Sequence, residues 1–251
     1  MKTKGGNMEN DHPCRDCTLR KSGAFMKNSD AEIGFIQQFK TRSLALEPGA
    51  LIIAEGLPSE DLYTLYSGWA FRFKTLSDGR RQILNFLLPG DFIGLQEKIA
   101  DISPHGVEAI TPVALCRFQR SGLWELYKNH PGLAYDVTWI AANQKDVLDE
   151  NLLSVGRRNA TERVATLLIQ LYKRLNVIGI ARGLTINFPL TQQHIADALG
   201  LSLVHTNKTL RRLTKMGFHQ IANGELTVHN PAALQKLADY YASEERIRPL
   251  I

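Results

Sequence analysis

The segment from 189 to 217 constrains the fold most, because its helix-capping and helix-ending residues fit two short helices joined by a tight turn. Thr191 precedes a periodic apolar run that ends at Gly200, and Ser202 precedes a second run that ends at Gly217. Thr and Ser are preferred caps at the start of a helix, and glycine adopts the left-handed backbone that often ends one. The apolar residues of the two runs are spaced to pack across the turn. The segment therefore predicts a helix-turn-helix.

Positive charge is concentrated on the second of these helices. Residues 202–217 contain no carboxylate, whereas the whole chain has a formal net charge of +5. The four basic residues are Lys208, Arg211, Arg212 and Lys215. Such side chains neutralise DNA phosphates, and the first turns of a recognition helix reach base edges in the major groove. The turn Asn223-Gly224 then predicts a hairpin, which is the wing of a winged helix. A solvated helical pair is the alternative, and the caps, the wing and the lack of acids together favour DNA binding.

Residues 43–119 follow a different pattern, with short β-branched and aromatic runs separated by turns. Gly68, Gly79 and Gly90 recur at intervals of 11 residues, and Ser77-Asp78-Gly79 is typical of a hairpin turn. This spacing predicts a small antiparallel sandwich or barrel. The aromatic residues within it are expected to form the core, and some of them to line a small apolar effector pocket.

A long amphipathic helix is predicted over residues 131–156. Its apolar positions recur at steps of three or four. The stripe consists of Val137, Ala141, Gln144, Leu148 and Leu152. Such a stripe packs on its own barrel or pairs with a second copy. We favour dimerisation, because the flanking segments supply no other helix to cover it.

The three cysteines, Cys14, Cys17 and Cys116, are an odd number, which argues against a disulfide framework and suits a reducing compartment. The polar N-terminus has no secretory signal, and no window has the apolar length of a membrane helix, so we expect a cytoplasmic protein that does not contact a membrane. Metal binding, redox chemistry and plain packing remain as roles for the cysteines.

In this order of parts the chain resembles the Crp/Fnr family of bacterial transcription regulators. The resemblance is carried by residues 88–94 (LPGDFIG) and 190–201 (LTQQHIADALGL). It implies an α+β fold with an N-terminal antiparallel β-barrel of the cyclic-nucleotide-binding-like jelly-roll type, a dimerisation helix and a C-terminal winged helix-turn-helix. It also implies a homodimer, double-stranded DNA with a palindromic operator, an effector or cofactor sensed by the N-terminal half, and RNA polymerase as a partner.

The expected domains are an N-terminal Cys-containing arm (1–28), a β-barrel sensor (29–130), the dimerisation helix (131–156) and the winged helix-turn-helix (157–251). Two departures from the family bear on the signal. Cyclic-nucleotide binders have a Glu where Leu95 stands and an Arg-Ser or Arg-Ala pair where Ser103-Pro104 stands. The phosphate would therefore lack a guanidinium partner, which argues against cyclic AMP.

The second departure concerns iron. Fnr-type sensors hold an iron–sulfur cluster with four cysteines, and Cys14, Cys17 and Cys116 match three of the four places, while Gly23 occupies the other. A four-iron cluster needs four ligands, so the resemblance leaves the fourth to another residue, with His12 and Asp16 as nearby candidates. The cofactor stays unknown at this point, with an iron–sulfur cluster as the candidate and packing as the alternative role.

The recognition helix also departs from the family, with Val204 and Lys208 at the positions of a usual Glu and Arg. An operator different from the usual half-site is expected. Base contacts are expected from Val204, His205, Asn207 and Lys208. Phosphate contacts are expected from Thr191, Gln193, Ser202, Arg211 and Arg212.

Two other classes of protein are alternatives to a DNA-binding regulator. A barrel metal enzyme needs two or three clustered histidines, and only His105 lies in the barrel, so we expect no enzyme. His105, between Pro104 and Gly106, is expected in a loop, with an effector contact as the second alternative. A barrel regulatory module that binds a protein in place of DNA is the remaining alternative. The pattern does not separate an activator from a repressor.

Overall fold

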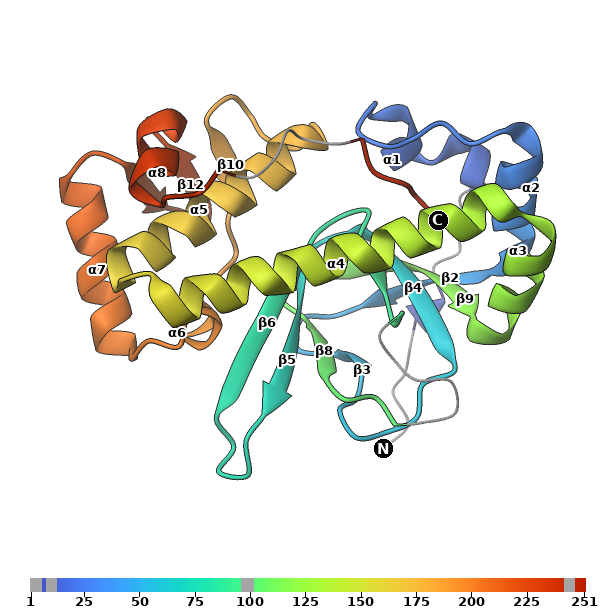
Figure 1. The fold of residues 1–251 in the computed structure, drawn as a ribbon, viewed down its shortest axis with the longest axis horizontal. Coiled ribbons are helices and arrows are strands. Elements are labelled where there is room, and N and C mark those ends of the chain that lie inside the picture. Colours follow the sequence, from blue (N-terminus) through green and yellow to red (C-terminus); the bar gives the residue numbers. More distant parts are fainter. Residues whose placement is uncertain (1–5, 8–12, 96–101, 242–246) are drawn as a thin grey trace. The chain divides into compact units, whose positions relative to one another are not determined.

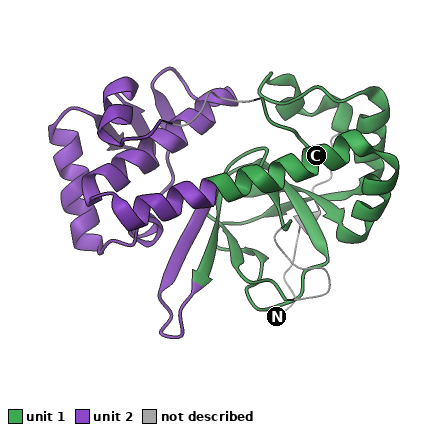
Figure 2. Cartoon of the chain, viewed as in Figure 1, with its two compact units in different colours: residues 1–74, 86–146, 247–251 green, residues 75–85, 147–246 purple. Residues whose placement is uncertain are grey.

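The structure is a computed structural model that describes residues 6–7, 13–95, 102–241 and 247–251. The chain forms two compact units, shown in different colours in Figure 2. Unit 1 consists of residues 1–74, 86–146 and 247–251, and unit 2 of residues 75–85 and 147–246. The elements of both units are labelled in Figure 1.

The described strands of the N-terminal half form two sheets with antiparallel pairing, as the sequence predicts. One sheet has the order β1-β2-β9-β4-β7, with β1 Gly6–Asn7, β2 Lys40–Leu46, β9 Val113–Gln119, β4 Asp61–Ser67 and β7 Phe92–Ile93. The other has the order β3-β8-β5-β6, with β3 Leu51–Ile53, β8 Gly106–Ala109, β5 Ala70–Thr75 and β6 Arg81–Leu87. A buried apolar cluster draws residues from both sheets.

The regularly spaced glycines lie at turns, as expected. Gly68, Gly79 and Gly90 have φ values of 90°, 85° and 88°, a region that side chains with a Cβ resist. At the predicted hairpin, Gly79 N donates to Leu76 O at 2.9 Å. The turn residues therefore determine where β5 ends and β6 begins.

Short helices flank the first sheet. They are η1 Cys14–Asp16, α1 Thr18–Lys21, α2 Asp30–Phe39, η2 Arg120–Gly122 and α3 Leu123–Asn129. Helix α2 begins at a capping box in which Ser29 accepts from the Glu32 amide and Glu32 accepts from the Ser29 amide. The Ser-x-x-Glu signal was present in the sequence, so this helix could have been predicted.

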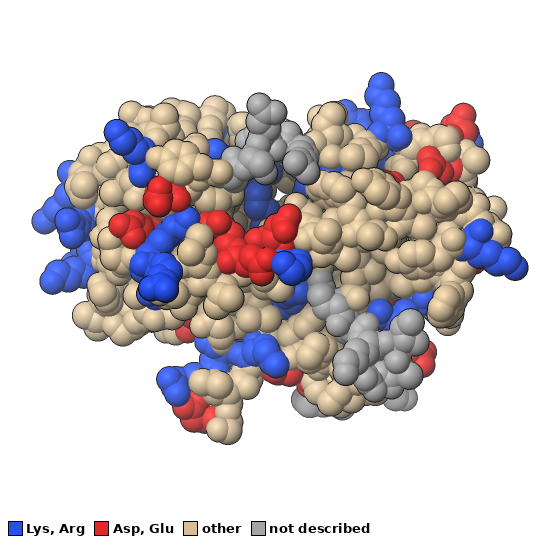
Figure 3. Space-filling view, viewed as in Figure 1, with Lys and Arg blue, Asp and Glu red and all other residues tan. Residues whose placement is uncertain are grey.

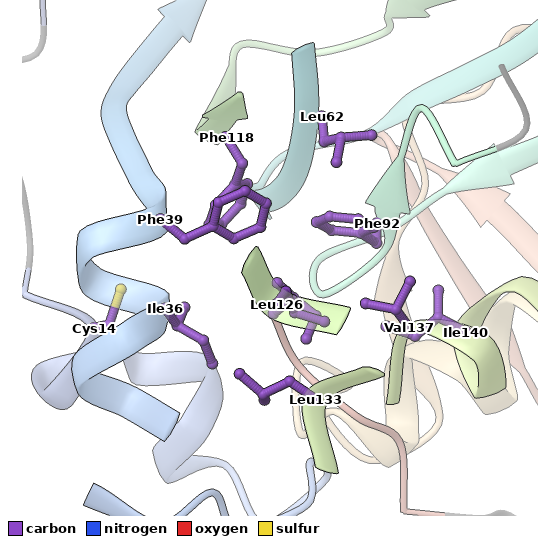
Figure 4. Packing of buried hydrophobic residues seen from close by; sticks show 11 residues of the cluster. Cys14, Ile36, Phe39, Leu62, Phe92, Phe118, Leu126, Leu133, Val137 and Ile140 are labelled. Carbon is purple, nitrogen blue, oxygen red and sulfur yellow. The ribbon is translucent and has the colours of Figure 1, made fainter. Parts of the chain in front are cut away.

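The long helix α4 spans Pro131–Arg157, one residue beyond the predicted end. In unit 1 its first half packs on its own sensor core, as Figure 4 shows for Val137 and Ile140 near Phe92. Val137 is 2% exposed, and Gln144 Nε2 donates to Phe92 O at 2.6 Å. These two members of the predicted dimer stripe are therefore used inside the chain. At 100° per residue the five members of the stripe lie within about 80° of one another, so they share one side of α4 and differ in burial along its length.

Unit 2 contains the predicted winged helix-turn-helix. Its helices are α5 Ala160–Val177, α6 Gln192–Leu199, α7 Leu203–Lys215 and α8 Pro231–Leu237. Its strands β10 Thr185–Asn187, β12 Glu225–Val228 and β11 His219–Ala222 form one antiparallel sheet in that order. Helix α5 begins at Asn159, whose side chain accepts from Thr161 N and Glu162 N.

The C-terminal residues 247–251 differ from the expected domain division, because they belong to unit 1 and not to the winged helix. Thr64 Oγ1 donates to Ile251 O at 2.7 Å, and Met26 N donates to Arg248 O at 2.8 Å. Ile251 is 4% exposed within the sensor core. In the part of the chain that the structure describes, no helix has the length and apolarity needed to span a bilayer.

Candidate DNA-binding interface and sensor sites

Helices α6 and α7 are fixed by the caps that the sequence predicts. The Thr191 hydroxyl accepts from His194 N at 3.1 Å, and the Ser202 hydroxyl accepts from His205 N at 3.2 Å. Gly200 ends α6 in the left-handed region, with φ 62° and ψ 37°. These contacts satisfy backbone donors that the helix starts would otherwise leave unpaired. The turn between the two helices is thus determined locally.

One face of α7 is buried and the opposite face is exposed. Thr206 and Leu213 have no exposed surface, and Leu210 is 8% exposed. Of the predicted base-reading residues, Val204 is 79% exposed, His205 and Lys208 are also exposed, and Asn207 is half-buried. The Oδ1 atom of Asn207 is buried and has no hydrogen-bond partner among the described residues. The amide is thus only partly accessible to a ligand.

The exposed face of α7 is cationic. Its four basic side chains, Lys208, Arg211, Arg212 and Lys215, are all exposed, and the helix contains no acidic residue. Figure 3 shows Lys and Arg side chains gathered at the edge where Figure 1 draws α7. A surface of this kind attracts a polyanion at long range.

The remaining predicted phosphate contacts lie at the helix starts. Thr191, Gln193 and Ser202 are exposed. The two hydroxyls act as cap acceptors, so their hydrogens are free to be donated outward. Gln193 Nε2 donates to Asp197 Oδ1 at 2.6 Å, so part of that amide is already engaged within α6.

The wing begins directly after α7. Asn223 and Gly224 have φ values of 53° and 74°, as the predicted two-residue turn requires. His219, the first residue of β11, is 1% exposed, and burial lowers its pKa to about 4. Its Nε2 lies 3.4 Å from Thr214 Oγ1, which links the wing to the end of α7.

All three cysteines line one pocket in unit 1. Cys14 is buried, Cys17 and Cys116 are half-buried, and none of the three forms a disulfide with another. Cys116 lies in β9, opposite Ser43 of β2 and Thr64 of β4. The other lining residues are Lys40, Ser43, Tyr66, Ala114 and Leu115. Residues about 100 positions apart in the sequence are therefore brought to one place.

Two buried cations accompany the thiols. Lys40 lines the pocket and is 7% exposed. Burial lowers the pKa of Arg20, and the charges of Cys17, Cys14 and Cys116 act in the opposite direction, which places this guanidinium near all three sulfurs. Arg20 is held by Asn28 Oδ1 and by Leu250 O, the latter at 3.1 Å from Nη2. Nearby cations favour the thiolate form of a cysteine.

Comparisons with known proteins agree with this geometry. The family models for the cyclic nucleotide-binding domain and the Crp-like helix-turn-helix domain match residues 43–130 and 162–237. The transcriptional activatory protein AadR of Rhodopseudomonas palustris is 30% identical over 192 residues, which are 76% of this chain and 79% of AadR. The chain belongs to the Crp/Fnr family of transcription regulators.

Further relatives lie in the same family. The nitrogen fixation regulation protein FixK of Bradyrhizobium diazoefficiens is 29% identical over 229 residues, or 91% of this chain and 95% of FixK. The structure of FixK2 from Bradyrhizobium japonicum superposes with a TM-score of 0.72 at 28% identity, covering 80% of this chain and 98% of FixK2. This Crp/Fnr chain is thus a DNA-binding transcription regulator, as the sequence predicts.

A four-iron cluster of the Fnr type does not fit the donor set that the described residues of this Crp/Fnr regulator supply. The pocket offers three thiols, and among the described residues no three His, Cys, Asp or Glu side chains group closely enough to hold one metal ion. Of the candidates for a fourth ligand, Asp16 pairs with Lys21 at 3.4 Å, and His12 lies outside the described residues. The Lys40 ammonium also lines the pocket, where a fourth ligand would be expected.

The positions at which cyclic-nucleotide binders hold the ribose and the phosphate carry no cation in this Crp/Fnr regulator. Leu95 is half-buried, and the hydroxyl of Ser103 donates to His105 O at 2.8 Å. Ser103 is 1% exposed, so its side chain is used to fix the local backbone. The arrangement agrees with the expectation that cyclic AMP is not the signal.

Sequence reasoning missed the cations of the sensor. Lys40 joins the cysteines through β2, which is distant from them in the chain, whereas Arg20 lies in α1 only three residues after Cys17. Arg72 is different, because it interrupts the apolar run 69–73 and is only 4% exposed. A charge inside a strand that is buried on both faces was a signal in the sequence.

Proposed function

We propose that the regulator acts as a homodimer joined along α4 and binds a palindromic DNA operator through two copies of α7. The observation that carries this proposal is the exposed, acid-free face of α7, with four cations on a helix whose other face is buried. A two-fold protein and a two-fold site match geometrically. RNA polymerase is the further partner that the family implies.

The dimer contact in this proposal uses the members of the α4 stripe that are not buried in the chain's own core. Ala141 and Leu152 are exposed, Leu152 at 73%, and Leu148 lies between them and is half-buried. These residues follow steps of seven and four along the helix, as in a two-stranded coiled coil. Val137 and Gln144 are removed from the proposed contact because they pack on the chain's own sensor core.

Sequence reading is assigned to Val204, His205 and Lys208, with Asn207 as a further contact. Val204 suits a thymine methyl, Lys208 suits guanine, and Asn207 suits adenine. Phosphates are assigned to the cationic and hydroxyl groups around them, which set the register. These residues are Thr191, Gln193, Ser202, Arg211 and Arg212.

The pocket lined by the three cysteines supports a redox signal carried by thiols. Two thiols form a disulfide when two electrons pass to an oxidant such as a peroxide and two protons are released. The nearby Arg20 and the lining Lys40 favour the thiolate that begins such a reaction. Thiol counting with and without hydrogen peroxide tests this part: a constant count of three accessible thiols in the unfolded chain contradicts it.

DNA binding itself is tested by fluorescence polarisation of a random-sequence duplex at 50 mM and 200 mM salt. Arg211 and Arg212 give two cationic phosphate contacts on each α7, and the two copies together predict a loss of affinity of at least about tenfold between these concentrations. The Lys208→Ala variant is then compared with the wild type in a selection from random operators. We expect relaxed preference at one base pair of each half-site.

Lys236→Ala, which removes a cation from α8 outside the recognition helix, is the matched control and should leave the selected motif unchanged. Absent or salt-insensitive binding would instead favour a regulatory module that binds a protein. An unchanged motif with Lys208→Ala would remove Lys208 from the base contacts but leave the DNA-binding proposal in place.

A further inference from the structure

Arg72 is a buried charge for which the described part of the protein offers no partner. It lies in β5, is 4% exposed, and its Nε and Nη2 atoms have no hydrogen-bond acceptor among the described residues. Burial alone lowers the pKa of its guanidinium to about 10, with no carboxylate acting in the opposite direction. At neutral pH the side chain is therefore a buried cation.

Three other buried or half-buried arginines contact carboxylates. Arg117 contacts Asp61 at 2.7 Å, and Arg248 contacts Asp91 at 3.0 Å. Arg158 contacts Glu150 at 2.5 Å. A buried charge without a partner is costly, since the loss of hydration is not compensated. Arg72 differs from these three arginines, because no carboxylate of the described residues contacts it and its Nε and Nη2 atoms have no acceptor there.

The strand register places Arg72 between the two sheets of the sensor. Arg72 lies opposite Val107 of β8, and Ala70, two residues earlier, lies opposite Ala109. Ala70, Val107 and Ala109 belong to the apolar cluster that also includes residues of the other sheet. Because side chains alternate along a strand, Arg72 extends from the same face as Ala70. Its charge is therefore directed into the sandwich.

A second unpartnered polar group lies nearby. His105 precedes β8, is 4% exposed, and its Nε2 atom has no hydrogen-bond partner in the described ranges. Burial lowers the pKa of His105 to about 4, and the positive charges of Arg72 and Lys74 contribute, which indicates that the guanidinium is close. The backbone here is fixed, since Ser103 donates to His105 O and Gly56 N donates to Ser103 O at 2.8 Å.

We propose that Arg72 and His105 form a binding site for a small anionic effector inside the sensor, with a carboxylate or a phosphate group paired to the guanidinium of Arg72. A planar guanidinium binds either group through two parallel hydrogen bonds. His105 Nε2 supplies a further donor or acceptor, according to its tautomer. The anion supplies the charge that Arg72 otherwise lacks, so binding stabilises unit 1.

This inference rests on the proposed function, because it names the chemistry of a small effector that the sensor would report. The proposed anion site is built on Arg72 of β5. It differs from the positions where cyclic-nucleotide binders hold the phosphate, which carry Ser103 and Pro104 in this chain. The regulator would therefore bind an anion although those positions lack an arginine.

The test measures thermal unfolding of the full, reduced chain with inorganic phosphate or with acetate, each against chloride at equal ionic strength. Tryptophan fluorescence is a local probe, because Trp69, Trp124 and Trp139 all lie in unit 1. We expect one of the two anions to raise the midpoint by about 3 °C at tenfold its dissociation constant. The anion that does so distinguishes a phosphate effector from a carboxylate effector.

Arg72→Met retains volume and removes the charge, so its midpoint should not respond to either anion. Arg72→Lys retains the charge without the planar fork and should respond weakly. Lys74→Met, which removes an exposed cation two residues away, is the control and should respond like the wild type. The His105 ring resonances of the wild-type chain should shift with the same anion, and this measurement does not depend on any variant.

The proposal is overturned if neither anion changes the wild-type midpoint, if Arg72→Met responds as fully as the wild type, or if the His105 resonances do not move. Binding of random-sequence duplex is measured on the same samples. Arg72→Met should retain it, because α7 lies in unit 2. Loss of the anion response with intact DNA binding therefore contradicts this inference alone, whereas loss of DNA binding in the wild type contradicts the proposed function.

Discussion

At the scale of single residues, His219 shows how a buried group connects the wing to the recognition helix. The ring is 1% exposed and its pKa is about 4, below the ordinary value near 6.5. Its Nε2 contacts Thr214 of α7, and its Nδ1 has no hydrogen-bond partner among the described residues. Folding therefore keeps this histidine neutral.

The pH dependence follows from that difference in pKa. Between pH 6.5 and 4 the unfolded chain binds a proton at this position that the folded chain does not, so the free energy of unfolding falls as the pH falls. The full effect is about 3 kcal/mol for a shift of this size. Amide hydrogen exchange in β11 and β12, corrected for the intrinsic rate, should report weaker protection through this window.

The variant His219→Phe should remove that dependence, because it has no proton to bind. His205, which is exposed on α7, supplies the control: His205→Gln should retain the wild-type profile. Equal loss of protection in wild type and His219→Phe between pH 6.5 and 4 would show that other groups are responsible.

The site residues differ in how far the sequence predicts them. Val204 and Lys208 could be predicted because a cap and a helical period determine which positions of α7 face outward. Cys116 could be grouped with Cys14 and Cys17 only through the family resemblance. Pairing between distant strands positions Cys116, and such pairing leaves no local signal in the sequence. Nothing local in the sequence predicts Lys40 beside them, since it lies more than 20 residues from each cysteine.

At the scale of elements, two turn glycines show that a turn can require glycine for its backbone conformation or for the lack of space for a side chain. Gly68 has φ 90°, and a Cβ added there would lie 2.3 Å from Pro112 O. Gly79 has φ 85°, but nothing lies within 4 Å of its added Cβ. The two positions therefore have a similar conformation but different space.

Gly68→Ala and Gly79→Ala should for this reason differ in stability. Gly79→Ala should cost about 1–2 kcal/mol from the left-handed backbone alone. Gly68→Ala should cost that amount and about 1–3 kcal/mol more from overpacking against backbone that cannot move away. Urea unfolding followed by tryptophan fluorescence and circular dichroism measures both, and equal costs would contradict the role of the close approach.

The apolar stripe of α4 is buried at one position and exposed at another. Val137 is buried in the sensor core, whereas Leu152 is 73% exposed. Sequence periodicity groups both in one stripe, because a contact with the chain's own sheet has the same period as a contact with a partner. The structure shows which positions of the stripe are covered by the chain's own core.

Leu152→Glu should therefore dissociate the proposed homodimer, since the two-fold contact places like charges near each other. Analytical ultracentrifugation at low micromolar concentration should show monomers. Val137→Ala should instead lower the free energy of unfolding by about 2 kcal/mol without changing the association state. A Leu152→Glu chain that remains dimeric would place the dimer contact elsewhere.

At the scale of the whole molecule, the chain crosses between its two units more than once. Residues 247–251 follow unit 2 in the sequence but belong to unit 1, as do their contacts with Phe25, Thr64 and Asp91. The sequence could not predict that this segment belongs to unit 1, because five residues are too few to show a periodic pattern. Its place is decided by side chains more than 150 positions away.

Arg248 anchors this segment, and its replacement tests how much the segment contributes. Its guanidinium donates to Asp91 Oδ1 at 3.0 Å and lies 5.4 Å from the centre of the Phe25 ring, with the two charged side chains 20% and 11% exposed. Because this pair is largely shielded from water, Arg248→Ala should lower the stability of unit 1 by about 1–3 kcal/mol in urea, followed by tryptophan fluorescence.

Arg15 offers the matched comparison, since its pair with Asp30 in the same unit is 3.9 Å long and its side chains are 67% and 90% exposed. Arg15→Ala should change the stability by less than about 0.5 kcal/mol, because exposed ion pairs are screened. If both variants lose little stability, the C-terminal segment is held by Ile251 and the backbone contacts, and Arg248 contributes little to its binding. If Arg248→Ala alone unfolds early, the sensor depends on residues that lie beyond the DNA-binding unit in the sequence, and truncation after the winged helix would damage the sensor before it affected DNA binding.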